Sequence, residues 1–142
     1  MAYPLEGIRE AWTVDASCTG NPGPMEYRCV HIPSGRQVFR YGPLQGTNNI
    51  GEFLAIVHAL ALQKQRGVSG VPVFTDSKTA LAWVRDKMAR TTLQLTPQTE
   101  KALELTRRAE AWLRGNAYST ELRKWDTEQW GEIPADFGRK KS

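Results

Sequence analysis

One stretch decides how this chain folds: Trp12-Thr13-Val14-Asp15-Ala16-Ser17-Cys18-Thr19-Gly20-Asn21-Pro22-Gly23-Pro24. Up to Ser17, apolar and polar residues alternate, which is the period of a β-strand with two unlike faces. The prolines and glycines that follow predict a rigid turn, because proline fixes φ and glycine accepts turn conformations. Asp15 therefore lies in a core strand, where a carboxylate is costly unless it is paired. It either caps the turn or holds a cation, and the residue alone leaves both interpretations open.

Composition places the chain among ordinary globular proteins. Its 142 residues suit one domain, predicted over residues 1–142 with 1–7 and 139–142 as flexible ends. The net charge of +4 is compatible with a polyanionic partner but does not require one. Two cysteines form neither a disulfide framework nor a zinc motif. With no apolar run of about 18 residues and no secretory pattern, we expect a cytoplasmic protein without membrane contact, and a monomer.

Hydrophobic periodicity predicts three strands followed by alternating helices and strands. The first three strands are predicted over Ile8–Ser17, Tyr27–Ile32 and Gln37–Tyr41, and their short links favour antiparallel pairing. The later elements are predicted as helices over Glu52–Arg66, Ser77–Met88, Pro97 to about Arg114 and Glu132–Gly138, with strands over Val71–Asp76 and Tyr118–Trp125. This order predicts an α/β protein with a mixed five-stranded sheet flanked by helices.

Four acidic residues fall at the ends of predicted elements. Asp15 and Asp76 end strands, Glu52 opens the first helix, and Asp136 lies at the start of the last one. Sites in α/β sheets collect at such strand ends. Four carboxylates gathered there would repel one another without a cation, and hard divalent ions such as Mg²⁺ prefer carboxylate oxygens. Two such ions can assist an in-line phosphoryl displacement.

Each acid also has a simpler interpretation. Asp76 could cap the helix that follows it, and Glu52 could lie near a helix N-terminus because the dipole favours it there. Asp136 could be a solvated helix acid. Only the set as a whole points to a metal site.

Three ordered motifs resemble the type 1 ribonuclease H family. Its first signature is similar to Asp15-Ala16-Ser17-Cys18-Thr19-Gly20-Asn21-Pro22-Gly23-Pro24, its second to Thr47-Asn48-Asn49-Ile50-Gly51-Glu52, and its third to Thr75-Asp76-Ser77. The resemblance covers about residues 8–139. It implies a ribonuclease H-like fold and an endonuclease that hydrolyses the RNA strand of RNA–DNA hybrids through two Mg²⁺ ions, with Mn²⁺ as an alternative.

The resemblance also implies roles for individual residues. Carried over by motif, the metal-binding and catalytic acids are Asp15, Glu52, Asp76 and Asp136, and the residues that contact the substrate backbone are Asn21, Thr47, Asn48 and Asn49. Glu52 would also lie near the 2′-hydroxyl that distinguishes RNA from DNA. Asp136 follows Ala135, as in the family, but Asp126 at the end of the fifth predicted strand is a rival for the fourth acid.

The sequence departs from the family pattern in two places. The family's histidine-bearing loop before the last acid is absent, since the chain's histidines, His31 and His58, lie far upstream. We hypothesise that Glu128 or Glu132 partly replaces that histidine as a proton shuttle. The basic handle helix of well-known bacterial members is also absent between Met88 and Thr96, which predicts weaker hybrid binding or a partner that supplies the grip.

Two other functions stay open from the sequence. One is a catalytically silent domain that binds hybrids or RNA, although clustered acids facing phosphate would not help such a protein. The other is a different nuclease of the ribonuclease H-like superfamily. Both are separated from the first hypothesis by which nucleic acids the protein cuts.

Overall fold

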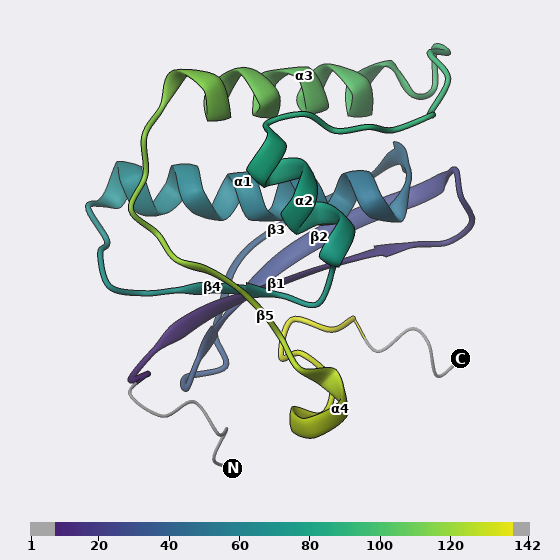
Figure 1. The fold of residues 1–142 in the computed structure, drawn as a ribbon. Helices are drawn as coiled ribbons and strands as arrows, with labels where there is room; N and C mark the ends of the chain where they lie inside the picture. Colours follow the sequence, from purple (N-terminus) through teal and green to yellow (C-terminus); the bar gives the residue numbers. More distant parts are fainter. Residues whose placement is uncertain (1–7, 138–142) are drawn as a thin grey trace.

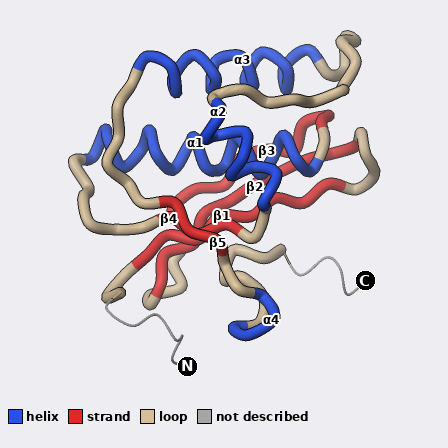
Figure 2. The backbone as a smooth tube through the Cα atoms, viewed as in Figure 1, coloured by secondary structure: helices blue, strands red, loops and turns tan. Residues whose placement is uncertain are grey.

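The sheet of this protein has five strands in the order β3-β2-β1-β4-β5. A computed structural model describes residues 8–137. β1 (Ala11–Cys18), β2 (Gly23–Ile32) and β3 (Gln37–Gly46) form an antiparallel meander. β4 (Val73–Thr75) pairs parallel with β1, and β5 (Leu122–Lys124) pairs parallel with β4. Figure 2 shows this mixed sheet in red, and it confirms the predicted fold class.

Three helices cover one face of the sheet, and a fourth lies on the other side (Figure 1). They are α1 (Asn48–Arg66), α2 (Lys78–Asp86), α3 (Glu100–Gly115) and the short α4 (Thr127–Trp130). Side chains fix where the first two begin: Thr47 Oγ1 accepts from the amide of Ile50, and Ser77 Oγ accepts from the amide of Ala80. No helix within residues 8–137 is long and apolar enough to cross a membrane.

The main core lies between β1, β2 and α1. Trp12, Val14 and Ala16 point from β1 into it, as their alternation predicts. α1 and β1 approach closely at Gly51, where an added Cβ would lie 2.8 Å from the Cβ of Ala16. This contact places the start of α1 directly over the end of β1.

A second, smaller apolar cluster covers the opposite face of the sheet. It consists of Ala11, Ile32, Phe74, Trp125 and Ile133. The indole Nε1 of Trp125 donates to the carbonyl oxygen of Gly131 at 2.9 Å, which closes the loop around α4. This cluster brings the chain beyond β5 back across the sheet.

Several predicted boundaries differ from the structure. β2 begins at Gly23 and β3 continues to Gly46, so the meander is longer than predicted, because pairing between the two strands extends order into the expected turn. The helix predicted from Pro97 begins at Glu100, since Thr96 and Thr99 hydrogen-bond each other's amides in a preceding turn.

The last predicted helix, over Glu132–Gly138, is wrong within the described residues. The helix there is α4, ahead of the predicted position, and the amide of Asp136 instead closes a turn onto the carbonyl oxygen of Ile133 at 2.8 Å. Burial of Ile133 in the second cluster fixes this turn. The predicted flexible ends, residues 1–7 and 139–142, together with Gly138, lie outside the described residues.

Candidate active site

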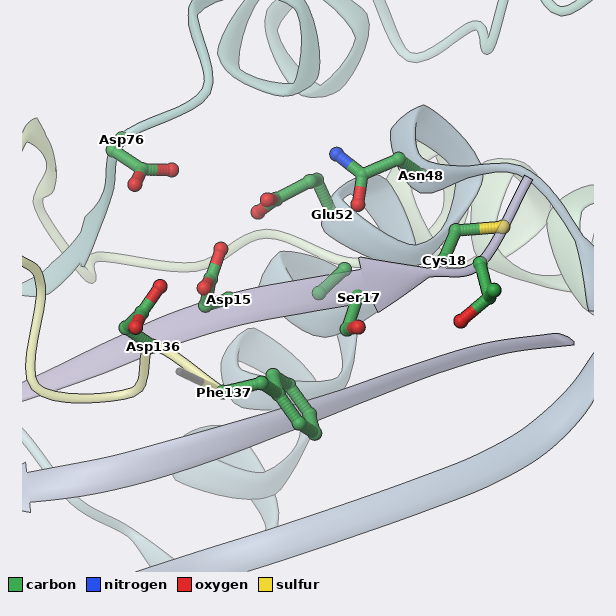
Figure 3. A pocket seen from close by; sticks show the side chains of 10 residues that line it. Asp15, Ser17, Cys18, Asn48, Glu52, Asp76, Asp136 and Phe137 are labelled. Atoms are coloured by element: carbon green, nitrogen blue, oxygen red, sulfur yellow. The ribbon is translucent and has the colours of Figure 1, made fainter. Parts of the chain in front are cut away.

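Three carboxylates meet where β1, α1 and β4 come together. Asp15 lies in β1, Glu52 in α1, and Asp76 directly after β4. One carboxylate oxygen from each lies within 4.8 Å of the other two. Figure 3 shows these side chains pointing into the same space from three different elements. The structure therefore brings three of the four candidate acids together.

The geometry weakens the simpler interpretations of two of these acids. The N-cap of α2 is Ser77, not Asp76, because the Ser77 hydroxyl accepts the hydrogen bond from the helix. Glu52 is the fifth residue of α1 rather than its first, so it lies just beyond the first turn, where the dipole acts most strongly. Only 3% of Glu52 is exposed. A buried carboxylate without a capping role needs another counterpart.

Burial and mutual repulsion change the protonation of this cluster. Burial raises the pKa of Asp15 to about 6; the negative charges of Asp76 and Asp136 also raise it, while a hydrogen bond with Glu52 partly offsets them. Burial, and then the charge of Asp15, hold the pKa of Glu52 well above its ordinary range. Each shift records the cost of holding negative charge here without a cation.

The donor set fits a hard divalent cation. Oε1 of Glu52 is buried and has no hydrogen-bond partner. An orphaned buried oxygen is rare in folded proteins, and an ion is one of its ordinary explanations. Together with the neighbouring carboxylates it offers the all-oxygen ligands that Mg²⁺ and Mn²⁺ prefer.

Asp136 reaches the same cavity from the chain beyond β5. The cavity, of about 530 Å³, is lined by Asp15, Ala16, Ser17, Cys18, Thr19, Asn48, Glu52, Asp76, Asp136 and Phe137. Asp126, the rival for the fourth acid, instead caps α4: its Oδ1 accepts from the amide of Gln129 at 3.1 Å. The position of Asp136 beside Asp15 makes it the better candidate.

The four candidate substrate residues surround the start of α1. Asn21 Oδ1 accepts from the amide of Asn48 at 3.1 Å, which ties the turn after β1 to the helix. Asn48 lines the acidic cavity, whereas Asn21 and Thr47 line a neighbouring groove of about 350 Å³. Asn49 is exposed. The cluster thus borders the acids on the side of the β1–β2 turn.

The hypothesised proton shuttles, Glu128 and Glu132, do not line the cavity of the acidic residues. Both are exposed, Glu128 in α4 and Glu132 shortly after it, and the acidic cavity is lined by other residues. His58, to which the sequence assigns no role, packs in the fold: its ring stacks on Phe39, and its Nδ1 lies 2.9 Å from the Tyr27 hydroxyl oxygen.

Comparison with known families decides what this arrangement is. A family model described as RNase H matches residues 9–126, which include β1, α1 and β4 with their three acids. The chain belongs to the RNase H family. The match ends before Asp136, so the position of the fourth acid rests on the structure.

One relative agrees with this assignment over part of the chain. Over 65 residues the chain is 42% identical to a protein named Ribonuclease H from Nitratidesulfovibrio vulgaris (strain DSM 19637 / Miyazaki F). That segment is 45% of this chain and 40% of the relative, so the match spans less than half of either.

The N-terminal RNase H domain of rv2228c from Mycobacterium tuberculosis, solved as a fusion with maltose binding protein, superposes with a TM-score of 0.55 at 19% identity, covering 84% of this chain and 88% of that one. RNase H1 from Halobacterium salinarum NRC-1 gives a TM-score of 0.48 at 20% identity, covering 82% and 83%. The first of these likenesses shows the shared RNase H fold.

Two residues at this RNase H site were not found from the sequence. Phe137 lines the acidic cavity, and Arg28 of β2 donates hydrogen bonds to the main-chain carbonyl oxygens of Ala135 and Asp136. No local pattern points to Arg28, because its partners lie more than 100 positions away in the sequence. The sequence feature that could have indicated Arg28 is a cation on β2, the strand that pairs with the strand of Asp15.

Proposed function

We propose that this protein is a metal-dependent endonuclease that hydrolyses the RNA strand of RNA–DNA hybrids. The observation that carries the proposal is the convergence of Asp15, Glu52 and Asp76, with a buried, unpartnered oxygen on Glu52. Membership of the RNase H family supports the reaction class, and so does the name of the Nitratidesulfovibrio relative.

The four acids would hold the metal, and we propose two Mg²⁺ ions, with Mn²⁺ able to replace them. Such a pair stabilises the attacking and leaving oxygens of an in-line phosphodiester hydrolysis. Asp15, Glu52, Asp76 and Asp136 come from four separate parts of the chain, so the folded scaffold fixes their spacing before substrate arrives. Their carboxylates line one cavity, where bound metal would offset their negative charge toward a substrate phosphate.

The polar residues around α1 would orient the nucleic acid. Asn21, Thr47, Asn48 and Asn49 offer amide and hydroxyl groups of the kind that contact phosphate and sugar oxygens. The hydrogen bond from the Asn48 amide to Asn21 Oδ1 holds the turn after β1 against the start of α1, beside the acids. Glu52, at the same helix, would lie near the 2′-hydroxyl of the RNA strand.

We retain Glu128 and Glu132 as candidates for proton transfer to or from solvent. Both side chains are exposed, and both residues belong to the segment between β5 and Asp136. A variant with alanine at both positions should lower the rate and shift its pH profile. An unchanged rate and profile would remove both residues from the mechanism.

The test is cleavage of a labelled RNA–DNA hybrid in Mg²⁺, in Mn²⁺ and in EDTA, with Asp15→Asn as the matched inactive variant. Cutting of the RNA strand alone, dependent on metal and lost in the variant, is the expected result. Binding of hybrid without cutting in either metal would indicate a silent binding domain. Cutting of double-stranded DNA or RNA in preference to hybrid would indicate another nuclease of the superfamily.

A further inference from the structure

Asp136 lies in a segment with little regular structure to hold it. We call residues 133–137 the arm; it follows α4 and contains neither helix nor strand. One end is anchored by Ile133, which is 1% exposed in the second apolar cluster. The amide of Asp136 bonds back to the carbonyl oxygen of Ile133. These contacts, with the fully buried side chain of Ala135, fix the start of the arm, and the direction of the residues after it depends on the contacts of other side chains.

Arg28 supplies the contact that sets this direction. It stands in β2 directly across from Asp15 in the antiparallel register. Its neighbours Tyr27 and Cys29 point into the core beneath the helices, so Arg28 projects from the other face of the sheet. Its Nε donates to the carbonyl oxygen of Ala135 at 2.7 Å, and its Nη2 donates to that of Asp136. The guanidinium therefore bonds the carbonyl oxygens of two consecutive peptide units.

The ring of Phe137 adds a further contact between Arg28 and the arm. The Arg28 guanidinium carbon lies 4.9 Å from the ring centroid, within the range of a cation–π contact. Arg40 of β3, the cross-strand neighbour of Arg28, lies 5.4 Å from the same centroid. In Figure 3 Phe137 lies along the sheet while Asp136 points toward the other acids. The two consecutive side chains thus have different tasks, one against the sheet and one at the cavity.

We infer that Arg28 is a positioning residue that docks the arm and so brings the Asp136 carboxylate to the acidic site. The inference rests on the proposed function, because it assigns Asp136 a part in holding metal. A planar guanidinium can donate two hydrogen bonds in a fixed geometry, and lysine cannot. Both hydrogen bonds of Arg28 go to main-chain carbonyls, so the contact orients the arm irrespective of the side chain at position 136.

A double-mutant cycle tests the assignment. Hybrid cleavage is measured for wild type, Arg28→Ala, Asp136→Asn and the double variant, with kcat and KM determined separately. Loss of a residue that orients a metal ligand commonly lowers activity by about 10- to 100-fold. We expect Arg28→Ala to lower kcat in that range with KM nearly unchanged. In the Asp136→Asn background the same change should cost less than about twofold, since there is no carboxylate left to position.

Two further variants make the result specific. Arg28→Lys keeps the charge and loses the paired hydrogen bonds, so its kcat should resemble that of Arg28→Ala. Arg66→Ala removes an exposed cation at the C-terminal end of α1, the end opposite Asn48, and should change kcat by less than about twofold. An equal fall in kcat from Arg28→Ala in both backgrounds, or full activity in Arg28→Lys, would overturn the inference.

Hydrogen exchange gives a readout that does not depend on activity. In Arg28→Ala without metal, amides of the arm should exchange at least about tenfold faster, with exchange in α1 unchanged. Unchanged exchange in the arm would overturn the inference. If wild type cleaves no hybrid, the proposed function fails, and this measurement alone still decides whether Arg28 docks the arm.

Discussion

Replacing Asp15 with asparagine should stabilise the metal-free protein at neutral pH while removing its activity. Asp15 is 7% exposed and lies beside three other acids. Its ionised form is therefore less favourable in the folded chain than in the unfolded one. Asparagine has nearly the same shape and no charge, so the substitution removes the repulsion without leaving a cavity.

The size of the effect follows from the pKa of Asp15. Burial raises this pKa from 3.8 to about 6. At about 1.4 kcal/mol for each tenfold change in proton affinity, the charged form costs the fold about 3 kcal/mol. Because the folded pKa is raised, this cost is absent below about pH 4, grows between about pH 4 and pH 6, and is complete above pH 6. The advantage of the variant over wild type should therefore grow by about 3 kcal/mol between pH 4 and pH 8.

The assay is urea unfolding followed by circular dichroism in metal-free buffer, at pH values from 4 to 8. Asp86→Asn is the matched control, because Asp86 pairs with Arg85 and Arg90, which lower its pKa rather than raise it. Its substitution should give no gain in stability at high pH. A difference between Asp15→Asn and wild type that is constant over the whole range, or that falls as the pH rises, would refute the argument from burial and repulsion.

Other substitutions and metal addition give further predictions. In thermal melts, Mg²⁺ should raise the melting temperature of wild type more at pH 8 than at pH 5, because protons compete with the metal for the carboxylates. The melting temperature of Asp15→Asn should be nearly unchanged by Mg²⁺. Thr47→Ala and Ser77→Ala each remove an N-cap and should each cost about 1 kcal/mol in urea unfolding, but only Thr47→Ala should also raise KM for the hybrid. Gly51→Ala should cost about 1–3 kcal/mol through overpacking against β1, whereas Gly115→Ala, with nothing within 4 Å of the added Cβ, should not destabilise the protein; unfolding curves compare the two.

Local sequence patterns were sufficient to predict the part of the site that belongs to regular elements. Alternation predicts β1 and therefore the burial of Asp15, and helical spacing predicts the body of α1, although from Glu52 rather than from Asn48. These patterns are physical consequences of the pleat and of the helical repeat, so they survive in the tertiary structure. Family resemblance then predicts which acids meet, and the structure brings Asp15, Glu52 and Asp76 together.

The chain beyond β5 could not be predicted in the same way. Its conformation depends on contacts with the second apolar cluster, where Trp125 and Ile133 are buried against Phe74. Such contacts join residues tens of positions apart, and no local period records them. A short helix was therefore predicted after Glu132, while the observed α4 precedes it and the arm closes into a turn.

The site accordingly has two parts that are held by different forces. Asp15 and Glu52 are fixed by the main core and Asp76 follows a buried strand, so moving any of them requires disrupting the sheet or α1. Asp136 is held by a turn, by the buried side chains of Ile133 and Ala135, and by the hydrogen bonds of Arg28 to the arm. Local opening requires less free energy where fewer buried contacts must break. We therefore expect the arm to open without unfolding of the protein, and we expect Arg28→Ala to make that opening more frequent.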